Sequence, residues 1–558
     1  MAASNETLRV RWLGTVPYRE ALAVQEATFR HGTGNHLLLL EHPHVFTHGP
    51  SADLSTNLKC DPADVAAELV SVKRGGDVTY HGPGQLVGYP LLALEGRNGP
   101  ADMTDASAYV HSVEDVLIGA LADLGLSTSR FDGYPGVWVG VGARPRKIAA
   151  IGVRVGRGRT MHGFALNVAP DLTYMRDHIV PCGIAEHPVT SLAEEGVNVT
   201  MREVVDAVVA RAAAVWGDGT IERQDVAWWE RPEDLSAFSR GEGPGAPVRL
   251  MGRLARAGVT DAVPLSEQKP DWIRPHVRHG EEVLGLKKTR RDLSLVTVCE
   301  EAGCPNLSEC WSDGTATFMV LGERCTRACG FCLIDTRKPE APDADEPARV
   351  AEAVRRMGLG HVVLTMVARD DLADDGMTHV ARCIEQIRAM DASTRIETLV
   401  SDARGSSSLD ILIEAEPDVF NHNIETVARL QRAVRPSAGY ARSLSVLSRA
   451  RTAGLCTKSG IIVGMGETDD EVRGTLADLA AVGVEIVTIG QYLRPTANHL
   501  PVARWVTPEM FALYKTWGEE MGIAHVESSP LTRSSYHARE AAETAGGRSV
   551  AVSIGVRP

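Results

Sequence analysis

Five apolar segments decide the fold class of the C-terminal half: HVVLTMV (361–367), RIETLV (395–400), DVFNHNI (418–424), CTKSGIIVG (456–464) and EIVTIGQYL (485–493). Apolar residues recur at helical spacing between and after these segments, near 345–358, 376–390, 442–453, 468–482 and 508–521. Strands that alternate with helices in this way are joined by right-handed crossovers and form a parallel sheet. We therefore expect an α/β half that contains a full or partial (β/α) barrel.

The N-terminal half shows a less regular mixture of the same two kinds of segment. Apolar runs typical of strands lie at 36–42, 85–94, 136–142 and 147–155, and helical spacing appears at 17–30, 106–124 and 200–214. Several strands follow one another without a helix between them. The pattern predicts a mixed α/β domain.

The two halves are separated by a stretch without either periodicity, from about residue 230 to residue 270. It contains Gly-Pro-Gly-Ala-Pro at 243–247, which interrupts both helices and strands. A chain of 558 residues also exceeds what one hydrophobic core normally supports. We expect domains at 1–232 and 266–558, joined by a linker at 233–265.

Composition and charge exclude some classes of function. The chain is 44% hydrophobic and 23% charged, as globular proteins are, and no apolar run approaches the ~18 residues of a membrane span. The N-terminus lacks the features of a secretory signal, so we expect a soluble, cytoplasmic protein. A net charge of −14 disfavours nucleic-acid binding. The one dense basic stretch comprises Arg144, Arg146, Lys147, Arg154, Arg157 and Arg159.

Cysteines gather in one region, because six of the ten fall between residues 299 and 332. In a reducing compartment this clustering indicates metal binding rather than disulfides. The segment RCTRACGFC (324–332) supplies three thiolates, from Cys325, Cys329 and Cys332. A [4Fe–4S] cluster with three such ligands keeps one iron open for a small molecule. A zinc knuckle is the alternative, but zinc needs four donors and no His-x3–5-His pair follows the loop.

A second set of three cysteines lies just upstream, at Cys299, Cys304 and Cys310 in a C-x4-C-x5-C arrangement. Six thiolates cannot all serve one cluster. Two sets of three therefore predict two [4Fe–4S] clusters.

The C-x3-C-x2-C loop resembles the signature of the radical S-adenosylmethionine (SAM) superfamily, and the preceding C-x4-C-x5-C set resembles lipoyl synthases specifically. The resemblance continues through RDDL (369–372), NHNIETV (421–427), VRP (434–436), TKSGIIVGMGET (457–468), TIGQYLRPT (488–496), HLPV (499–502) and RSSYHA (533–538). It covers nearly everything from Leu284 to about Ala541. Biotin synthase is the nearest competitor, but the upstream cysteine set and RSSY do not suit it.

This resemblance assigns roles to further residues. Contacts to SAM are implied for Phe331, Asn423, Glu425, Gly464 and Glu467, although strand ends also carry such residues for local turns. Ser535 of RSSY is implied as the fourth ligand of the auxiliary cluster, which gives up sulfide to the substrate. Capping of the following helix by Ser534 and Ser535 is the alternative. The sequence departs from the family at 366–368, which is Met-Val-Ala, and at Asp375, where glycine is usual.

The segment RGGDVTYHGPGQLVGYP (74–90) is the most informative part of the N-terminal half. Paired glycines and Gly-Pro-Gly around a short strand indicate a backbone that something approaches closely. Two interpretations remain open from these residues alone: a ligand cradle and a plain β-hairpin.

Together with KIAAIGVRV (147–155), HGFALNV (162–168) and IVPCGI (179–184), this segment resembles the octanoyltransferases of lipoate biosynthesis, relatives of biotin and lipoate protein ligases. The resemblance implies that their catalytic fold is shared, that Cys182 is acylated and that Lys147 handles its proton. A thiol needs such a neighbouring base or cation to attack a thioester at neutral pH. The implied octanoyl pocket comprises Arg74, Gly75, Gly76, Asp77, Val78, Thr79, Tyr80, His81, Ala150, Ile151, Gly152, Gly163, Phe164 and Ala165.

The two resemblances predict a bifunctional protein lipoylation enzyme. It would transfer octanoyl from acyl carrier protein to a lysine of lipoyl domains and then insert sulfur at C6 and C8, with SAM and two clusters as cofactors. Expected partners are octanoyl-acyl carrier protein, lipoyl domains of 2-oxoacid dehydrogenase complexes and glycine cleavage H protein, and an electron donor such as flavodoxin or ferredoxin. The basic stretch at 144–159 suits docking of an acidic carrier, or is a solvated hairpin with surface arginines. The alternative function joins an ATP-dependent lipoate or biotin ligase to an iron–sulfur carrier.

Overall fold

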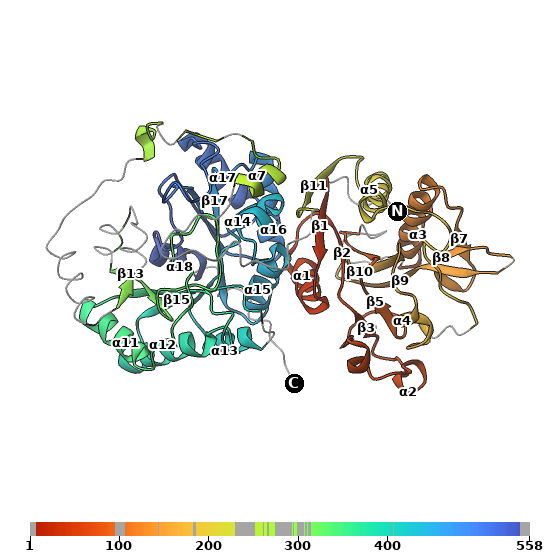
Figure 1. Cartoon of the computed structure of the whole chain (residues 1–558), viewed down its shortest axis with the longest axis horizontal. Helices are drawn as coiled ribbons and strands as arrows, with labels where there is room; N and C mark the ends of the chain where they lie inside the picture. Colours follow the sequence, from red (N-terminus) through yellow and green to blue (C-terminus); the bar gives the residue numbers. More distant parts are fainter. Residues whose placement is uncertain are drawn as a thin grey trace. The chain divides into compact units, whose positions relative to one another are not determined.

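The structure is a computed structural model of the chain. It describes residues 7–94, 106–142, 144–181, 186–228, 251–260, 262–264, 267–273, 293, 295–297, 306, 310, 314–404 and 407–546. Residue contacts divide the chain into two compact units, Met1–Trp228 and Trp229–Pro558, which are coloured from red to yellow and from green to blue in Figure 1.

The C-terminal unit is built on one eight-stranded sheet whose strands follow chain order. These are β12 (Val296–Thr297), β13 (Thr315–Val320), β14 (His361–Met366), β15 (Arg395–Leu399), β16 (Val419–Asn421), β17 (Cys456–Val463), β18 (Ile486–Gln491) and β19 (His525–Ser528). Strands β13 to β19 are all parallel, and β12 pairs antiparallel with β13 at the edge. Sequential order with parallel pairing is the arrangement that the alternating pattern predicts.

Most helices of the unit lie on the outer side of this sheet, whereas the last one, 538–546, packs against the first residues of β16, β17 and β18 (Figure 1). The helices are α11 (Glu346–Met357), α12 (Met377–Met390), α13 (Ser408–Glu414), α14 (Gln431–Val434), α15 (Tyr440–Thr452), α16 (Asp469–Ala481), α17 (Pro508–Glu520) and α18 (Ala538–Gly546). Within the described ranges the strand order ends at β12 and β19 without closing, so the unit is an open, partial barrel. The carboxyl ends of parallel strands share one edge, which therefore collects the loops that carry function.

The N-terminal unit has a mixed eight-stranded sheet in the order β11-β1-β2-β6-β10-β9-β8-β7. Its strands are β1 (Leu8–Thr15), β2 (Asn35–Glu41), β6 (Gln85–Leu91), β7 (Ser129–Phe131), β8 (Tyr134–Val139), β9 (Arg146–Gly156), β10 (Arg159–Asn167) and β11 (Ile221–Asp225). A smaller sheet joins β4 (Glu68–Ser71), β3 (Val45–His48) and β5 (Thr79–His81). Helices α1 (Tyr18–His31), α2 (Leu54–Asn57), α3 (Ala106–Asp123), α4 (Thr173–Arg176) and α5 (Met201–Trp216) complete the unit.

The glycine-rich segment 74–90 crosses from one sheet to the other. Strand β5 pairs with β3, whereas β6 pairs with β2 and β10, so the two strands do not form a hairpin with each other. The hairpin interpretation is therefore wrong. Gly84 makes the crossing possible, because its φ is +81° and a Cβ there would lie 2.4 Å from the Ala169 carbonyl oxygen.

Part of the expected linker packs on the C-terminal unit. Helix α7 (Met251–Arg256) contacts α14, and the side chains of Leu254 and Ala257 are buried. The Val263 N–H donates to the Val502 carbonyl at 2.7 Å. Residues 251–264 thus belong structurally to the C-terminal unit wherever they are described.

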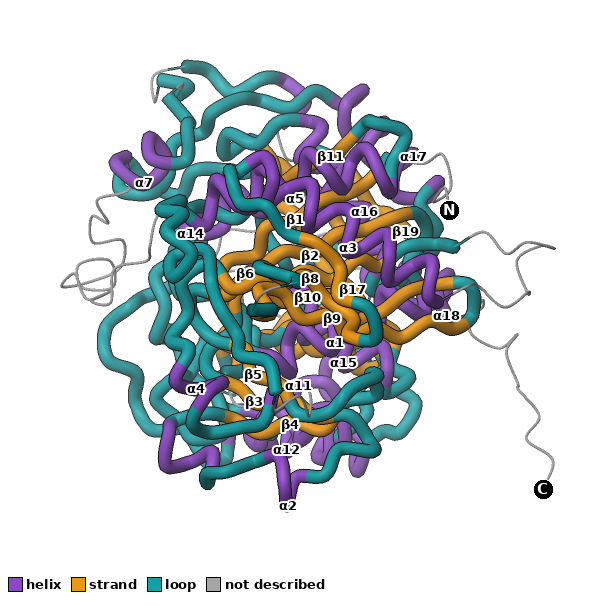
Figure 2. Tube along the Cα trace, turned by 90° about the vertical axis from the view of Figure 1, so that its right-hand side faces the viewer, coloured by secondary structure: helices purple, strands orange, loops and turns teal. Residues whose placement is uncertain are grey.

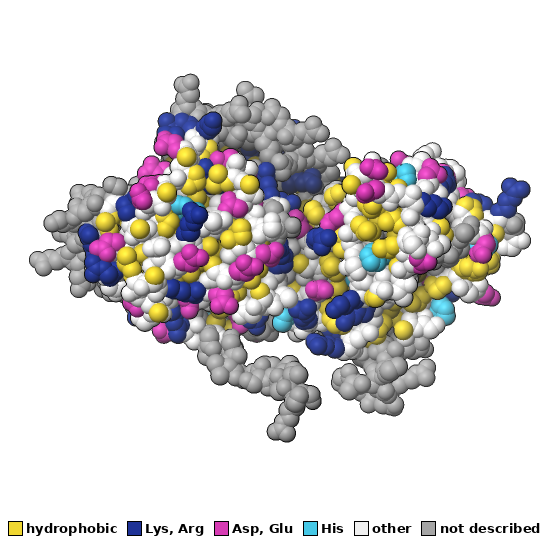
Figure 3. Space-filling view, turned by 90° about the horizontal axis from the view of Figure 1, so that it is seen from below, with side chains coloured by type: hydrophobic (Ala, Val, Ile, Leu, Met, Phe, Trp, Pro, Cys, Tyr) yellow, Lys and Arg dark blue, Asp and Glu magenta, His cyan; other side chains and the backbone are white. Residues whose placement is uncertain are grey.

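None of the described helices, which are drawn in purple in Figure 2, is both long and apolar enough to cross a membrane. On the face that Figure 3 shows, acidic, basic and apolar side chains are interspersed over both units.

Candidate functional site

The loop after β13 carries Cys325, Cys329 and Cys332, which are all partly buried and free of disulfides. Burial raises the pKa of Cys329 to about 11, and it also raises the pKa of Cys325 and Cys332. Negative charge on Cys329 and Cys325 raises the pKa of Cys332 further. Such thiols lose their protons when a bound metal cation replaces them.

Neighbouring strand ends hold this loop in place. The hydrogen bonds run from Thr326 N–H to the Ala368 carbonyl (3.0 Å), from Gly330 N–H to the Val434 carbonyl (2.8 Å), from Leu500 N–H to the Gly330 carbonyl (3.0 Å) and from His499 Nε2 to the Cys332 carbonyl (3.0 Å). Motifs that lie far apart in the sequence, VRP and HLPV, therefore meet at the cysteine loop.

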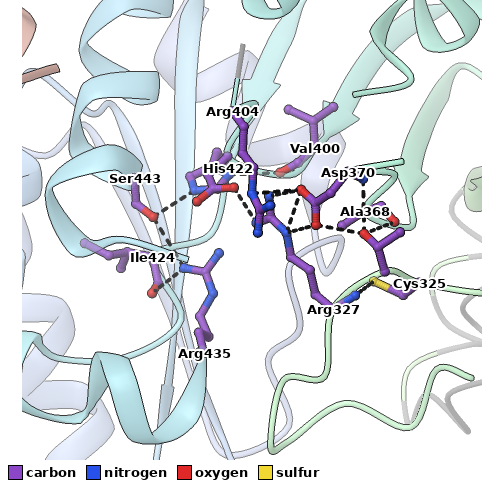
Figure 4. Close-up of polar contacts among 12 residues, drawn as sticks. Cys325, Arg327, Ala368, Asp370, Val400, Arg404, His422, Ile424, Arg435 and Ser443 are labelled. Atoms are coloured by element: carbon purple, nitrogen blue, oxygen red, sulfur yellow. Dashed lines mark hydrogen bonds and ion pairs between the residues drawn. The ribbon is translucent and has the colours of Figure 1, made fainter. Parts of the chain in front are cut away.

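Arg327 anchors the middle of the loop (Figure 4). Its side chain is 6% exposed, and its guanidinium donates to both carboxylate oxygens of Asp370 (Nη2–Oδ1 2.6 Å, Nε–Oδ2 2.9 Å) and to Asp402. Asp370 also pairs with Arg404 at 3.2 Å. Burial alone would raise the pKa of Asp402, but the charge of Arg327 outweighs it and holds the pKa at about 2. Sequence analysis missed this arginine, because its acidic partners follow β14 and β15.

A second layer of hydrogen bonds supports these partners (Figure 4). His422 donates from Nδ1 to the Val400 carbonyl at 2.9 Å and accepts at Nε2 from the Ser443 hydroxyl at 3.0 Å. Burial lowers the pKa of His422 to about 4, so the ring is neutral at pH 7. Arg435 donates to the Ile424 carbonyl at 3.0 Å. The network ties the cysteine loop to strands β15 and β16.

Replacing Arg327 by glutamine should weaken cluster binding by about 10–100-fold, the range found when partners of metal ligands are removed. Asp370 and Asp402 would remain buried without their counter-charge, which also destabilises the fold by ~3–5 kcal/mol. Iron retained per chain after challenge with a chelator measures the first effect, and thermal unfolding measures the second. Arg404→Gln is the control, because the side chain of Arg404 is 41% exposed and pairs with the same carboxylate, that of Asp370. Equal iron retention in Arg327→Gln and Arg404→Gln would contradict an anchoring role.

The three thiols fit a [4Fe–4S] cluster, in which each thiolate binds a separate iron. Among the residues that the structure describes, no three His, Cys, Asp or Glu side chains converge as a single metal ion requires. Zinc would need four donors within ~2.0–2.3 Å of one point. Three thiols on one loop are the ligand set of a [4Fe–4S] cluster that keeps one iron open.

The implied SAM contacts lie at neighbouring strand ends. Asn423 is buried after β16 and donates from Nδ2 to the Ser534 hydroxyl at 2.6 Å. Glu425 has a φ of +66°, and burial raises the pKa of its carboxyl. Phe331 is partly buried within the cysteine loop itself.

Gly464 and Glu467 follow β17. The Glu467 carboxylate accepts the N–H groups of Gly464 (2.5 Å) and Met465 (3.0 Å), and burial raises its pKa. Gly464 has a φ of +97°, and a Cβ there would lie 2.1 Å from Gln491 Nε2. In this structure Glu467 fixes the backbone of the loop that follows β17. Gly464 has no side chain, so this loop can lie close to Gln491.

The second cysteine set is described only in part, because Cys299 and Cys304 lie outside the described residues. Cys310 packs on the core of the C-terminal unit. Asn306, between the second and third cysteines, donates from Nδ2 to the Leu531 carbonyl at 2.8 Å. This contact joins the segment to the loop that leads into RSSY, where Ser535 lies partly buried in the turn at 534–537.

The departures from the family pattern have structural explanations. Ala368 serves the cysteine loop through its carbonyl, which accepts from Thr326 N–H and Oγ1, so its side chain is not required. Asp375 has a φ of +52°, the region that favours glycine and that aspartate tolerates better than most residues.

In the N-terminal unit, Lys147 lies near the start of β9 and is 7% exposed. Its Nζ lies over the Trp138 ring, 4.8 Å from the centroid. Its backbone N–H donates to the Pro188 carbonyl, and its carbonyl accepts the Thr190 N–H, both at 2.9 Å. Cys182 lies outside the described residues, but the chain that follows it is thus bound to Lys147.

The structure brings the three segments of the implied octanoyl pocket together. Strands β9 and β10 pair so that Ala150, Ile151 and Gly152 face Ala165, Phe164 and Gly163. The loop before β5 approaches them: a Cβ at Gly152 would lie 3.4 Å from the Gly75 carbonyl and 3.2 Å from Arg74 Cδ. Gly76 has a φ of +92° in that loop.

The remaining pocket residues are fixed by contacts of their own. Asp77 accepts from Asn57 Nδ2 at 2.8 Å and from the Val78 N–H at 2.6 Å. Thr79 pairs with Thr47 in the small sheet. Tyr80 is fully buried and hydrogen bonds His44 Nδ1 at 2.8 Å, and His81 bonds Gln85 at 2.8 Å.

Buried polar residues also line this region, and sequence analysis missed them. His42 donates from Nδ1 to the Val16 carbonyl and accepts at Nε2 from the Tyr89 hydroxyl, both at 2.7 Å. Burial lowers the pKa of both His42 and His162 to about 4. His162 has a φ of +61°. It lies within the motif HGFALNV, so it was the one histidine of this set that the sequence motifs included.

The basic stretch does not form one patch. Arg146 pairs with Glu195 through two 2.8 Å contacts, and Arg159 donates to the Gly34 carbonyl at 3.0 Å. Arg144 and Arg157 lie beyond opposite ends of the eleven-residue strand β9, so ~35 Å of strand separates them. Docking of an acidic carrier at these arginines stays a prediction.

A three-cysteine loop at the carboxyl edge of an open parallel sheet defines the C-terminal unit as a radical SAM enzyme, and the Radical SAM superfamily model matches residues 319–479. The Lipoyl protein ligase A/B catalytic domain model matches residues 17–213. The lipoyl synthase of Rubrobacter xylanophilus is 53% identical over 280 residues, which are 50% of this chain and 87% of that protein. That of Mycobacterium leprae is 49% identical over 304 residues, 54% of this chain and 97% of that protein.

The chain belongs to the lipoyl synthase family. It carries in addition an N-terminal domain of the lipoyl protein ligase type, so the expected fusion is confirmed. The expectation of an enzyme with transferase and sulfur-insertion activities is confirmed with it.

Proposed function

We propose that this chain carries out two successive steps of protein lipoylation. The N-terminal unit transfers octanoyl from acyl carrier protein to a lysine of a lipoyl domain through an acyl thioester on Cys182. The C-terminal unit then inserts sulfur at C6 and C8 of the attached chain. Lipoyl domains of 2-oxoacid dehydrogenases and the glycine cleavage H protein are the acceptors, a ferredoxin or flavodoxin is the electron donor, and the cytoplasm is the compartment.

The main support for the proposed first step is the hydrogen bonding of residues 188–190 to Lys147. An ATP-dependent ligase activates a carboxylate as an adenylate and needs no nucleophilic thiol. Here the segment that follows Cys182 is hydrogen bonded to both backbone groups of a buried lysine. These contacts support a pairing of Cys182 with Lys147, which thioester exchange requires because a thiol needs an adjacent base.

The exchange balances without ATP. The neutral amine of Lys147 takes the proton of the Cys182 thiol, and the thiolate attacks the carbonyl carbon of the octanoyl thioester. The carbon–sulfur bond to the carrier breaks, and the departing carrier thiolate takes the proton from Lys147. In the second half the acceptor amine attacks the carbonyl carbon of the acyl-cysteine and gives its proton to Lys147. The carbon–sulfur bond to Cys182 then breaks, and the departing Cys182 thiolate takes that proton from Lys147. The Trp138 ring stabilises Lys147 while it is protonated.

In the C-terminal unit, Cys325, Cys329 and Cys332 hold one [4Fe–4S] cluster, and Cys299, Cys304, Cys310 and Ser535 hold the other. The cluster of the first set, when bound, supplies the electron that cleaves SAM. Arg327, Val434 and His499 fix the loop of the first set, and Asn306 fixes the second set beside RSSY.

The test of the transfer step is incubation of the full chain with octanoyl-acyl carrier protein in the absence of ATP. Mass spectrometry should find one octanoyl group on the peptide with Cys182. Transfer that requires ATP and free octanoate, without an adduct, would instead support a ligase.

Lys147→Ala should lower the rate of octanoyl transfer by about 10²–10⁴-fold, the usual contribution of a positioned base. Lys147→Arg should restore little, because arginine stays protonated. Single-turnover transfer from octanoyl-acyl carrier protein measures both, and Lys73→Ala serves as a control at a lysine outside the expected site. A rate within threefold of the unchanged protein in either Lys147 variant would leave Lys147 without a role in proton transfer.

A further inference from the structure

Three buried polar side chains and one backbone carbonyl form a hydrogen-bonded series between the glycine-rich segment and the chain that follows Cys182. His81 Nδ1 bonds Gln85 Oε1 at 2.8 Å, Gln85 Nε2 donates to Asn167 Oδ1 at 2.9 Å, and Asn167 Nδ2 donates to the Thr190 carbonyl at 2.9 Å. His81 is 8% exposed, Gln85 2%, Asn167 4% and Thr190 1%. We call these residues the amide relay.

The direction of each bond in the amide relay is fixed by its last member. The Thr190 carbonyl can only accept, so Asn167 must present its NH2 group to it and its oxygen to Gln85. Gln85 must then present its oxygen to His81, which has to donate from Nδ1. Burial lowers the pKa of His81 to about 3, so the neutral ring carries its single proton at Nδ1.

The amide relay ends on the backbone that binds Lys147. The Thr190 N–H donates to the Lys147 carbonyl, and the Leu192 N–H donates to the Asn167 carbonyl at 3.0 Å. Asn167 therefore holds this segment at two points, from the end of β10. Val189 forms a parallel β-bridge with Lys147, and the hydrogen bonds of Pro188 and Thr190 flank this bridge.

We propose that Asn167 and Gln85 are positioning residues that set the register between Lys147 and the segment carrying Cys182. This inference rests on the proposed octanoyl transfer. Asn167 touches neither the thiol nor the acyl group; it acts through Thr190. Without its amide the Thr190 carbonyl loses a buried partner, and the 186–190 stretch is free to shift along β9.

Two substitutions at Asn167 separate this role from a general effect on stability. Asn167→Asp keeps the shape but cannot donate to Thr190, and Asn167→Leu removes both bonds without adding charge. Gln85→Met is a milder variant that keeps the Asn167–Thr190 bond. Asn35→Asp is the matched control, because Asn35 is also fully buried in the sheet and its oxygen accepts the Ala93 N–H.

The readout is the pH dependence of Cys182 alkylation by iodoacetamide in the full chain, followed by peptide mass spectrometry. A nearby protonated lysine lowers the pKa of a thiol, so loss of register moves the midpoint upward toward ~8.5. Both Asn167 variants should shift the midpoint upward by about one pH unit or more and slow octanoyl transfer by about 100-fold, the cost of a displacement of ~1 Å. Gln85→Met should shift it less, and Asn35→Asp not at all.

Two failures are distinguishable. If Lys147→Ala leaves the midpoint of Cys182 alkylation unchanged, the proposed thiol–lysine pair is wrong. If Lys147→Ala shifts the midpoint but no Asn167 or Gln85 variant does, the proposed function stands and the positioning role is overturned. SAM cleavage by the C-terminal unit and thermal unfolding confirm that each variant is folded.

Discussion

Cys182→Ser should lower octanoyl transfer by at least ~10³-fold while SAM cleavage stays at its original rate. Serine keeps the size of the side chain, but its hydroxyl is far less acidic than a thiol and is a poor nucleophile at neutral pH. SAM cleavage depends on residues of the other compact unit, Trp229–Pro558. Single-turnover transfer and the release of 5′-deoxyadenosine measure the two activities on the same preparation.

The matched control is Cys60→Ser, a partly exposed cysteine of the same unit that belongs to no expected site. It should change neither activity. An octanoyl adduct that maps to Cys60, or full transfer by Cys182→Ser, would show that the nucleophile has been assigned to the wrong residue.

Alanine at Cys325, Cys329 or Cys332 should abolish reductive cleavage of SAM, whereas alanine at Cys299, Cys304 or Cys310 should spare cleavage and stop sulfur insertion. In the proposed function, the first set would hold the iron that binds SAM, and the second would hold the source of sulfide. Iron analysis of anaerobically purified protein should give about eight iron atoms per chain for two clusters and about four after loss of either set.

Cys456→Ala is the control for this series, because Cys456 is a partly buried cysteine of the same unit at the start of β17. It should retain all iron and both activities. Equal loss of cleavage from both cysteine sets would show that the two clusters depend on each other for folding, or that their roles have been divided wrongly.

The strands that sequence predicts best are those buried on both faces. Segments such as 361–367 and 456–464 are long and apolar, and the structure places β14 and β17 there. Strand β13 (Thr315–Val320) was missed because Thr-Ala-Thr interrupts its apolar run. Strand β10 (Arg159–Asn167) was found only as a motif, since His162 and Gly163 are poor strand formers.

The candidate site was predictable where its chemistry is local in sequence. The cysteine loop and the 74–81 segment can each be recognised from a few consecutive residues. The ion pairs of Arg327 with Asp370 and Asp402 join residues 43 and 75 positions apart, and no local pattern encodes them. The Gln85–Asn167 bond spans 82 positions and depends on the pairing of β6 with β10.

Glu467 shows how a correct motif can conceal a structural role. The resemblance implies a contact with SAM, yet both oxygens of its carboxylate already accept backbone N–H groups of its own loop. Glycine at 464 and the capping box of Thr468 and Glu471 at the start of α16 serve the same turn. These hydrogen bonds depend on the backbone conformation of the loop, which could not be predicted from the sequence motif.

The packing of residues 251–264 decides where the chain can be divided without loss. Val259 lies against Gly466, where a Cβ would come within 2.5 Å of it, and Arg429 donates to both the Ala257 carbonyl and the Gly466 carbonyl. A C-terminal fragment that began at residue 266 would lack the contact of Val259 with Gly466 and the hydrogen bond from Arg429 to the Ala257 carbonyl, both beside the GMGE loop. If the two activities were encoded by separate genes, we therefore expect both to be retained only if the chain were divided before Met251. Residues 251–264 would then remain part of the sulfur-inserting protein.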